Sequence, residues 1–357
     1  MEKIHPVKKI DLKGIDIHET VEFIEGLGLE RYRAIQIRQW LFKKLTVSFD
    51  EMTNLSKPVR EKLKAHSNIN NLVKIKSQIS RDTTEKYLFR LWDGLHVESV
   101  LIPERDHFTL CVSSQAGCAM GCRFCLTARL GFKRNLSPAE IVEQVIQVKM
   151  SMNNPNRLTN IVFMGMGEPL ANYSSVLKAI GNLVSEDGMN FSHRKITLST
   201  SGLVPRIRTL GKDTTVNLAV SLNAADDETR DYLMPINRKY PLGSLIAACK
   251  EFPLPNRRMI TFEYVLIDGI NDHEDDALKL VRLLHGIRAK INLISMNPAP
   301  GINMVGSSEK AILRFQDILI KNHFTAIIRK SKGRDISAAC GQLSGEMERD
   351  ISMIHQR

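Results

Sequence analysis

Short apolar segments alternate with longer amphipathic segments from residue 109 onward. Seven apolar runs have the length and the β-branched content of strands: TLCVSS, NIVFMG, KITLST, VNLAVSL, ITFEYVLI, INLISMN and TAIIRKS. Helical spacing of apolar residues occurs between them, over residues 137–150, 174–186, 241–252, 273–288 and 308–322. This alternation predicts βαβ units and a parallel sheet, and therefore an α/β fold built as a full or partial βα barrel.

The segment before residue 109 has a different pattern. Residues 16–66 have helical periodicity, whereas residues 85–102 alternate with a period near two around the pair Asp93-Gly94. Such a pair is typical of a two-residue hairpin turn. We therefore expect a helical accessory module over residues 1–80, a hairpin over 81–108, the barrel over 109–345 and a C-terminal tail over 346–357.

The chain is basic, with 50 Lys and Arg residues against 39 Asp and Glu residues and a formal net charge of +11. Such an excess attracts polyanions, of which nucleic acid is the commonest in a cytosol, although a basic protein can also lack such a partner. No apolar run approaches the roughly 20 residues of a membrane span. The N-terminal sequence MEKIHPVKKIDLKG is charged and lacks an apolar signal segment. We expect a cytoplasmic protein without membrane contact.

Three of the six cysteines lie in one loop, in the sequence GCAMGCRFC. Three residues separate Cys118 from Cys122, and two separate Cys122 from Cys125. Three thiolates at this spacing would bind three irons of a [4Fe–4S] cluster and leave the fourth iron open to a small molecule. S-adenosylmethionine can chelate that iron, and one electron from the cluster then cleaves it to a 5′-deoxyadenosyl radical. The motif predicts a radical S-adenosylmethionine (radical SAM) enzyme.

Two other metal sites are compatible with clustered cysteines. A zinc site normally has four ligands in paired spacing, and the sequence has no second CxxC or nearby pair of histidines. A ferredoxin-type cluster needs a fourth cysteine, for which Cys111 is a candidate on the preceding strand. The βα context of the motif favours the radical enzyme over both.

Six segments together resemble the RlmN/Cfr family of radical SAM enzymes, which methylate adenosine in RNA. They are LCVSSQAGCAMGCRFC at 110–125, FMGMGEPLAN at 163–172, TLSTSG at 197–202, LMPIN at 233–237, INLISMNP at 291–298 and DISAACGQL at 335–343. The resemblance covers residues 10–345. It implies a radical SAM partial βα barrel with a small N-terminal helical module and a hairpin.

The resemblance also implies residues that bind S-adenosylmethionine. Gly167 and Glu168 would receive its ammonium group at the end of the second barrel strand. Contacts to its ribose, carboxylate or adenine would come from Ser199, Ser221, Leu222, Asn223 and Asn297. Asn223 departs from the family pattern, which commonly has histidine at this position.

Two further cysteines and a carboxylate have chemical roles in the family. Cys340 matches a cysteine that is first methylated and whose methyl carbon then adds to adenine. Cys111 matches a second thiol that attacks the sulfur of Cys340 and releases the product by forming a disulfide. Glu98 matches a carboxylate that accepts the ring proton, although Cys111 as a thiolate is an alternative acceptor.

Three functions are therefore compatible with the sequence. The first is methylation of adenosine at carbon 2, in large-subunit ribosomal RNA and in tRNA next to the anticodon. The second is Cfr-like methylation at carbon 8, against which GEP rather than GEA at 167–169 argues. The third is a non-enzymatic Fe–S or zinc protein that binds RNA. For either enzyme we expect a monomer reduced by a donor such as flavodoxin or ferredoxin.

Basic residues near these motifs are candidates for RNA contacts, because phosphate neutralisation dominates RNA affinity. Some follow the cysteine loop and some precede Cys340, where they would rim the active-site mouth. These are Arg129, Lys133, Arg134, Arg329, Lys330, Lys332 and Arg334. The helical module would grip RNA further out with Arg31, Arg33, Arg38, Lys43 and Lys44.

Overall fold

The centre of the molecule is a single large sheet in this computed structural model, which describes residues 9–343; the expected tail over 346–357 lies outside them. Within the described residues the strand order is β14-β13-β12-β11-β10-β9-β6-β5-β4-β3. The strands from β6 to β14 pair in parallel, as expected for βαβ units. They are β6 (Phe108–Cys111), β9 (Leu158–Phe163), β10 (Ile196–Thr200), β11 (Asn217–Ser221), β12 (Ile260–Leu266), β13 (Ala289–Ser295) and β14 (Thr325–Ile328). All seven predicted strands are confirmed.

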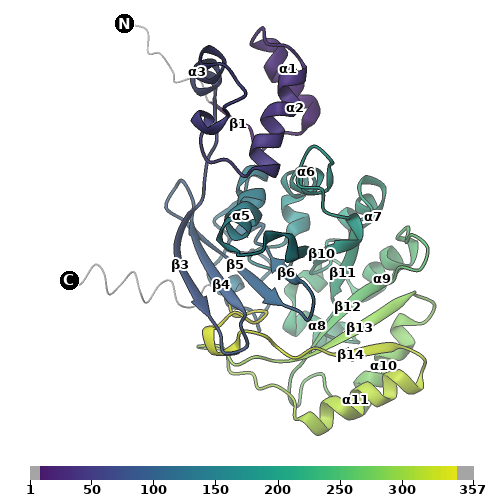
Figure 1. Cartoon of the computed structure of the whole chain (residues 1–357). Coiled ribbons are helices and arrows are strands. Elements are labelled where there is room, and N and C mark those ends of the chain that lie inside the picture. The colour runs from purple at the N-terminus through teal and green to yellow at the C-terminus, as the bar shows by residue number, and fades with distance from the viewer. Residues whose placement is uncertain (1–8, 344–357) are drawn as a thin grey trace, which may run out of the picture.

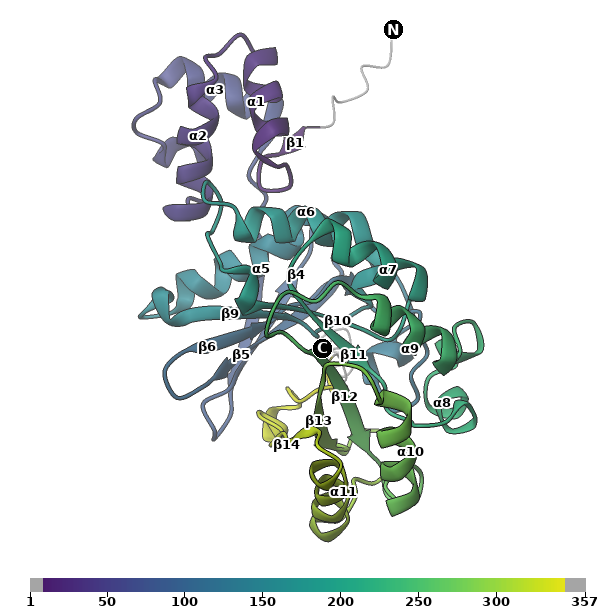
Figure 2. The same cartoon turned by 90° about the vertical axis from the view of Figure 1, so that its right-hand side faces the viewer.

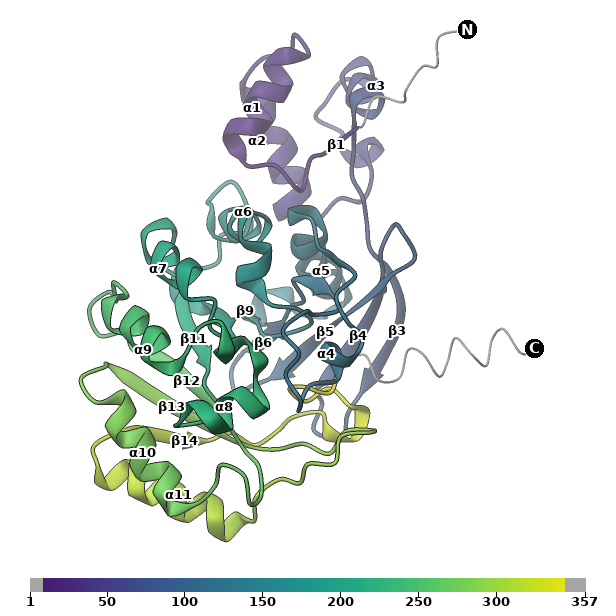
Figure 3. The ribbon, with the colours of Figure 1, turned by 180° about the vertical axis from the view of Figure 1, so that it is seen from behind.

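Helices cover the outer face of the curved sheet, as Figures 2 and 3 show. The five predicted helices are confirmed as α5 (Pro138–Ser151), α6 (Tyr173–Val184), α9 (Leu242–Glu251), α10 (Glu274–Leu284) and α11 (Glu309–Lys321). Three further helices were not predicted: α4 (Leu126–Arg129), α7 (Val204–Asp213) and α8 (Asp227–Leu233). The barrel therefore has the expected alternation of strand and helix.

Helix α5 shows how the sequence sets these elements. Ser137 accepts a hydrogen bond from the Glu140 N–H, and the Glu140 side chain accepts one from the Ser137 N–H. This reciprocal capping box and Pro138 at the first helical position fix where the helix begins. Ile141, Val142 and Val145 are then fully buried against the sheet.

The barrel is open, because three antiparallel strands extend the sheet beyond β6 instead of closing it. They are β5 (His96–Pro103), β4 (Glu85–Arg90) and β3 (Val73–Ile79). The hairpin predicted around Asp93-Gly94 is confirmed as β4 and β5. β3 falls within the range expected for the helical module, but the structure pairs it with β4. Its residues Val73, Ile75 and Ile79 remain exposed, so backbone pairing and not burial holds this strand.

The N-terminal module stands beside α5 and α6, at the top of Figure 1. It comprises β1 (Ile10–Asp11), α1 (Ile17–Gly26), α2 (Tyr32–Arg38), a π-helical turn (Gln39–Lys43), a short 3-10 turn (Phe49–Glu51), α3 (Lys57–His66) and β2 (Ser67–Asn68). Lys13 forms a buried ion pair with Glu143 of α5, and Arg38 pairs with Asp187 after α6. Arg38 is only 1% exposed, so the expectation that it contacts RNA was wrong. Its ion pair with Asp187 instead holds the N-terminal module against the barrel.

The segment that carries Cys340 crosses the inner side of the sheet, where it is drawn in yellow in Figure 1. On one side, the Leu126 N–H donates to the Gly341 carbonyl at 2.8 Å, and the Gln342 side chain donates to the Pro298 carbonyl at 2.6 Å. On the other side, the Gly333 N–H donates to the Asp82 carboxylate at 3.0 Å. The segment is thus held between the cysteine loop and the turn that joins β3 to β4.

Candidate active site

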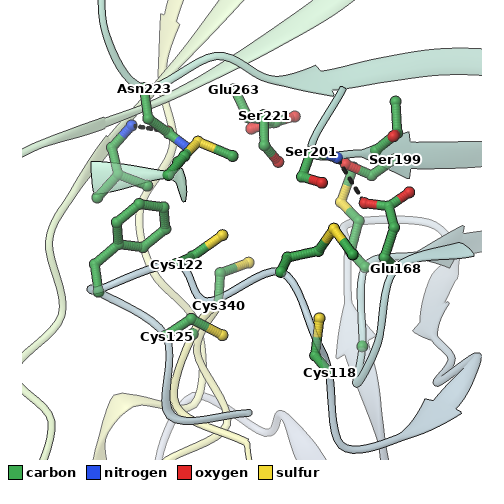
Figure 4. A pocket seen from close by; sticks show the side chains of 18 of the residues that line it. Cys118, Cys122, Cys125, Glu168, Ser199, Ser201, Ser221, Asn223, Glu263 and Cys340 are labelled. Atoms are coloured by element: carbon green, nitrogen blue, oxygen red, sulfur yellow. Dashed lines mark hydrogen bonds between the residues drawn. The ribbon is translucent and has the colours of Figure 1, made fainter. Parts of the chain in front are cut away.

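A cavity lies inside the barrel between the cysteine loop and the carboxyl ends of the parallel strands; we call it the first chamber (Figure 4). Most of the site residues predicted from the sequence line it. These are Cys118, Cys122, Cys125, Gly167, Glu168, Ser199, Ser221, Asn223, Asn297 and Cys340. Residues up to 222 positions apart therefore meet in one place, as expected where parallel strands end at the same edge of a sheet.

The loop of three cysteines is shaped by tight backbone contacts. Gly117 adopts a positive φ of 74°, and a Cβ at this position would lie 1.8 Å from the Gly131 carbonyl oxygen. The Cys125 N–H donates to the Cys122 carbonyl at 3.2 Å, which turns the loop into α4. Burial raises the pKa of Cys118 to about 12 and raises that of Cys122 as well. These thiols are therefore protonated at neutral pH, and each must lose its proton before its sulfur can bind iron.

The arrangement of the thiols fits a cluster. Within residues 9–343, no three His, Cys, Asp or Glu side chains converge on a point where they could hold one metal ion. Cluster ligands bind different irons and need not converge on one point, so the spacing of these three thiols is compatible with a cluster. All three face the first chamber, in which a small molecule could reach an open iron.

A buried guanidinium lies behind the loop. Arg230 is fully buried and donates to the carbonyl oxygens of Ser201, Leu222 and Ser221 at 2.7, 3.0 and 3.3 Å. It thereby fixes the ends of β10 and β11. Its charge also opposes the rise in the pKa of Cys122 that burial causes, and so favours the thiolate that iron needs. The sequence analysis missed Arg230, since an arginine in a short helix carries no distinguishing pattern.

The turn after β9 depends on its glycines. Gly167 has φ +99°, and a Cβ there would lie 2.5 Å from the Gln115 side chain. The Glu168 carboxylate accepts hydrogen bonds from the Ser201 N–H at 2.7 Å and from the Leu170 N–H at 3.0 Å. Burial raises the pKa of Glu168, and these hydrogen bonds oppose that rise. A fixed, buried carboxylate at the chamber wall suits a cationic ammonium group.

Asn223 and Asn297 have their side chains committed within the protein. Asn223 has φ +59°, a conformation that asparagine tolerates better than most residues, and its side-chain oxygen accepts from the Val265 N–H at 2.9 Å. Asn297 accepts from Arg334 at 2.9 Å, which ties the strand end to the segment carrying Cys340. Ser199 and Ser221 line the chamber, whereas Leu222 does not and is fully buried.

A second cavity adjoins the first, and we call it the second chamber. Cys111 lines only this chamber, whereas Cys340 lines both. Several cations also line it, namely Arg194, Lys195, Lys290, Arg329, Lys330 and Lys332. The cysteine loop has no side chain in it. Cys340 thus lies on the boundary between a chamber lined by the cysteine loop and a chamber lined by positive charge.

Cys340 and Cys111 are free thiols in different surroundings. The Cys340 side chain is exposed to the two chambers. The surrounding protein nevertheless limits its hydration, and this burial and the Glu263 carboxylate together raise its pKa to about 11. Burial raises the pKa of Cys111 further, and the nearby Cys340 sulfur adds to that effect. Both are therefore thiols at neutral pH in the protein alone. The sixth cysteine, Cys249, is buried in α9 as predicted.

Glu98 and Glu263 are carboxylates on the inner face near these thiols, and Glu104 also lines the second chamber. Glu98 on β5 is buried and pairs with Lys86 at 3.3 Å, and it lines neither chamber. Glu263 on β12 lines both chambers and accepts a hydrogen bond from Asn292 at 2.8 Å. The sequence analysis missed Glu263, although it is the one charged residue in the strand run ITFEYVLI and alternates with inward-facing Thr261 and Val265.

No helix formed by residues 9–343 combines the length and the apolar character that a membrane span requires.

Two family models match the chain. The radical SAM superfamily matches residues 112–281, and the ribosomal RNA large subunit methyltransferase N-terminal domain matches residues 10–69. The second match covers the docked helical module.

Individual proteins match over nearly the whole chain. The dual-specificity RNA methyltransferase RlmN of Geobacter sulfurreducens is 56% identical over 339 residues, which cover 95% of this chain and 93% of that protein. The protein of the same name from Syntrophus aciditrophicus is 52% identical, over 95% of this chain and 98% of its own. A crystal structure of a radical SAM methyltransferase from Sphaerobacter thermophilus superposes with a TM-score of 0.89 at 45% identity, over 93% of this chain and 98% of that one. The chain belongs to the RlmN family of radical SAM methyltransferases, which use a [4Fe–4S] cluster and S-adenosylmethionine.

Proposed function

We propose that this enzyme methylates carbon 2 of adenosine, in large-subunit ribosomal RNA and in tRNA next to the anticodon. The observation that supports the proposal most is the position of Cys340 between the two chambers. A residue that carries carbon from a cofactor to an RNA base must reach both. The first chamber offers the cysteine loop, and the second offers cations suited to RNA phosphates.

In this proposal Cys118, Cys122 and Cys125 hold the cluster. Gly167 and Glu168 receive the ammonium group of S-adenosylmethionine, with further contacts from Ser199, Ser221, Leu222, Asn223 and Asn297. When bound, the cluster and S-adenosylmethionine supply a methyl group and a carbon-centred radical. Glu168 is suited to its part because two backbone N–H groups already hold its carboxylate in place. Leu222 would act through packing, since its own N–H and carbonyl bond within the protein.

Cys340 accepts the methyl group in this scheme, and its sulfur is then joined through that carbon to the adenine ring. Cys111 lines the same chamber as Cys340 and would attack its sulfur, forming a transient disulfide and freeing the RNA. The ring proton goes to Glu98 in this scheme, or to Cys111 once that thiol has lost its own proton, which burial disfavours by raising its pKa. Glu98 pairs with Lys86 at 3.3 Å and lines neither chamber, so as acceptor it would have to receive the proton through a group that does.

Carbon 2 is preferred to carbon 8 on two grounds. Curated relatives above 50% identity bear the name RlmN, and the turn at 167–169 reads GEP. A donor such as flavodoxin or ferredoxin, action as a monomer and a cytoplasmic location belong to the same proposal.

Purified protein, reconstituted anaerobically with iron and sulfide, tests the proposal directly. We expect it to convert adenosine to 2-methyladenosine in transcripts of the ribosomal RNA and of tRNA, when supplied with S-adenosylmethionine and a reductant. Nucleoside mass spectrometry with chromatographic standards separates the 2-methyl from the 8-methyl isomer. Formation of 8-methyladenosine would support a Cfr-like enzyme, and RNA binding without consumption of S-adenosylmethionine would support a non-enzymatic protein.

A further inference from the structure

Basic and amide side chains gather where three neighbouring barrel strands begin, at the end of the barrel opposite the cysteine loop. Arg194 and Lys195 directly precede β10, and Arg257 and Arg258 precede β12. Asn217 opens β11. Since β10, β11 and β12 are parallel neighbours, their first residues lie at one edge of the sheet. Residues far apart in sequence therefore form one surface.

A surface cavity at this edge is lined by five residues, which we call the phosphate anchor: Arg194, Asn217, Asn256, Arg257 and Arg258. Every one of these side chains carries hydrogen-bond donors, and none is a carboxylate. Asn217 donates to the Arg194 carbonyl at 2.8 Å, and Arg258 donates to the Thr215 carbonyl, so two backbone contacts hold the group together. Arg257 has φ +63°, a conformation unusual for arginine. Such a lining suits an anion.

The arginines of the anchor differ from many other cations of the molecule in lacking a carboxylate partner. Among residues 9–343, no ion pair involves Arg194, Arg257 or Arg258. Three cations that the sequence analysis assigned to RNA are instead engaged: Arg33 pairs with Glu30, Arg38 pairs with Asp187, and Arg134 pairs with Asp93 and Glu140. Unpaired guanidinium groups keep their full attraction for a ligand anion.

The anchor is continuous with the chamber in which the reaction is proposed to end. Arg194 lines both the anchor and the second chamber, which holds Cys111 and Cys340. A nucleotide whose base enters the second chamber has its flanking phosphates outside, along the chain in both directions. Because Arg194 lines both cavities, a phosphate next to that nucleotide would lie close to the phosphate anchor.

We propose that the phosphate anchor binds the RNA backbone next to the nucleotide whose base occupies the second chamber. This inference rests on the proposed function, because it takes the occupant of the second chamber to be an RNA base. Substrate RNA therefore approaches the amino-terminal ends of the barrel strands, while the cofactors occupy the carboxyl ends. Planar guanidinium groups bind phosphate in two-pronged fashion, and the two asparagine side chains add neutral donors.

The test removes the three charges and measures RNA affinity as a function of salt. The variant Arg194→Ala/Arg257→Ala/Arg258→Ala should bind substrate tRNA at least about tenfold more weakly near 0.1 M salt. The slope of log affinity against log salt concentration should fall by about two, since each phosphate contact in a single strand contributes about 0.7. Replacing the same three arginines by lysine keeps the charge and should retain most of the slope.

A matched control removes three exposed cations that have carboxylate partners. Arg208, Arg314 and Lys321 pair with Glu251, Glu274 and Asp317, so their triple alanine variant loses the same charge away from the anchor. It should bind RNA nearly as the wild type does. Both triple variants should bind S-adenosylmethionine normally, which shows that the barrel is intact. Equal RNA affinity and equal salt slope in the anchor and control variants would overturn the inference.

Binding and methylation are separate readouts, so the two proposals fail differently. Wild-type protein that binds RNA through the anchor but methylates none would overturn the proposed function and leave the anchor standing. Wild-type protein that methylates RNA while the anchor variant binds it with undiminished affinity would overturn the anchor alone.

Discussion

Replacement of Cys111 by alanine should leave the protein covalently joined to its RNA. In the proposed scheme the Cys340 sulfur is bonded through the transferred carbon to adenine, and only a second thiol releases it. Cys111 is the other cysteine that lines the second chamber with Cys340. After reaction with end-labelled RNA, denaturing gel electrophoresis of Cys111→Ala should show a retarded band that protease removes. Most reacted RNA should be in that band, with little free methylated product.

Three variants control this experiment. Cys340→Ala lacks the attachment point and should give neither band nor product, and the double variant should behave in the same way. Cys249→Ala removes a thiol that is buried in α9 outside both chambers, so it should release methylated RNA as the wild type does. Free methylated RNA from Cys111→Ala at the wild-type rate would show that Cys111 does not resolve the adduct.

Loss of any one loop cysteine should remove most of the iron. Three thiolates leave no spare ligand for a four-iron cluster, so Cys118→Ala, Cys122→Ala or Cys125→Ala should each bind only a small fraction of the wild-type iron and sulfide. Iron and sulfide analysis of anaerobically reconstituted protein measures this directly. Within the described residues Cys111 lines a different chamber from the loop, so Cys111→Ala should keep the cluster.

The result for Cys111→Ala also separates two ligand sets. Full iron content in that variant fits a three-cysteine cluster with an open iron, whereas its loss would indicate the ferredoxin-type site with Cys111 as fourth ligand. Retention of full iron and sulfide by all three loop variants would mean that the cluster is held elsewhere. Cys249→Ala again serves as the control and should keep its iron.

The barrel was predictable because its strands and helices have strong and different periodicities. Runs such as ITFEYVLI are short, apolar and β-branched, and the helices between them have apolar faces long enough to recognise. The cysteine loop was predictable because its spacing is local. The structure then brings Cys118, Glu168 and Asn297 to one chamber, as the parallel strand order requires.

Features that depend on contacts between distant segments were not predictable. β3 pairs through its backbone with little burial of its own apolar residues, so its sequence carries a weak signal. Arg230 is recognised as a positioning residue only once the carbonyl groups around it are seen. The second chamber, and Glu263 in its wall, exist because the segment carrying Cys340 folds back across the open barrel. No local pattern in the sequence predicts the course of this segment.

The most direct test of the account is nucleoside mass spectrometry of ribosomal RNA and tRNA from cells whose only copy of the gene encodes Cys340→Ala. Cells with the wild-type gene should contain 2-methyladenosine in both RNA classes. In the Cys340→Ala cells it should be absent from both, with the protein still present at normal level and still containing its cluster. Persistence of 2-methyladenosine in those cells would contradict the central claim that Cys340 carries the carbon to adenine.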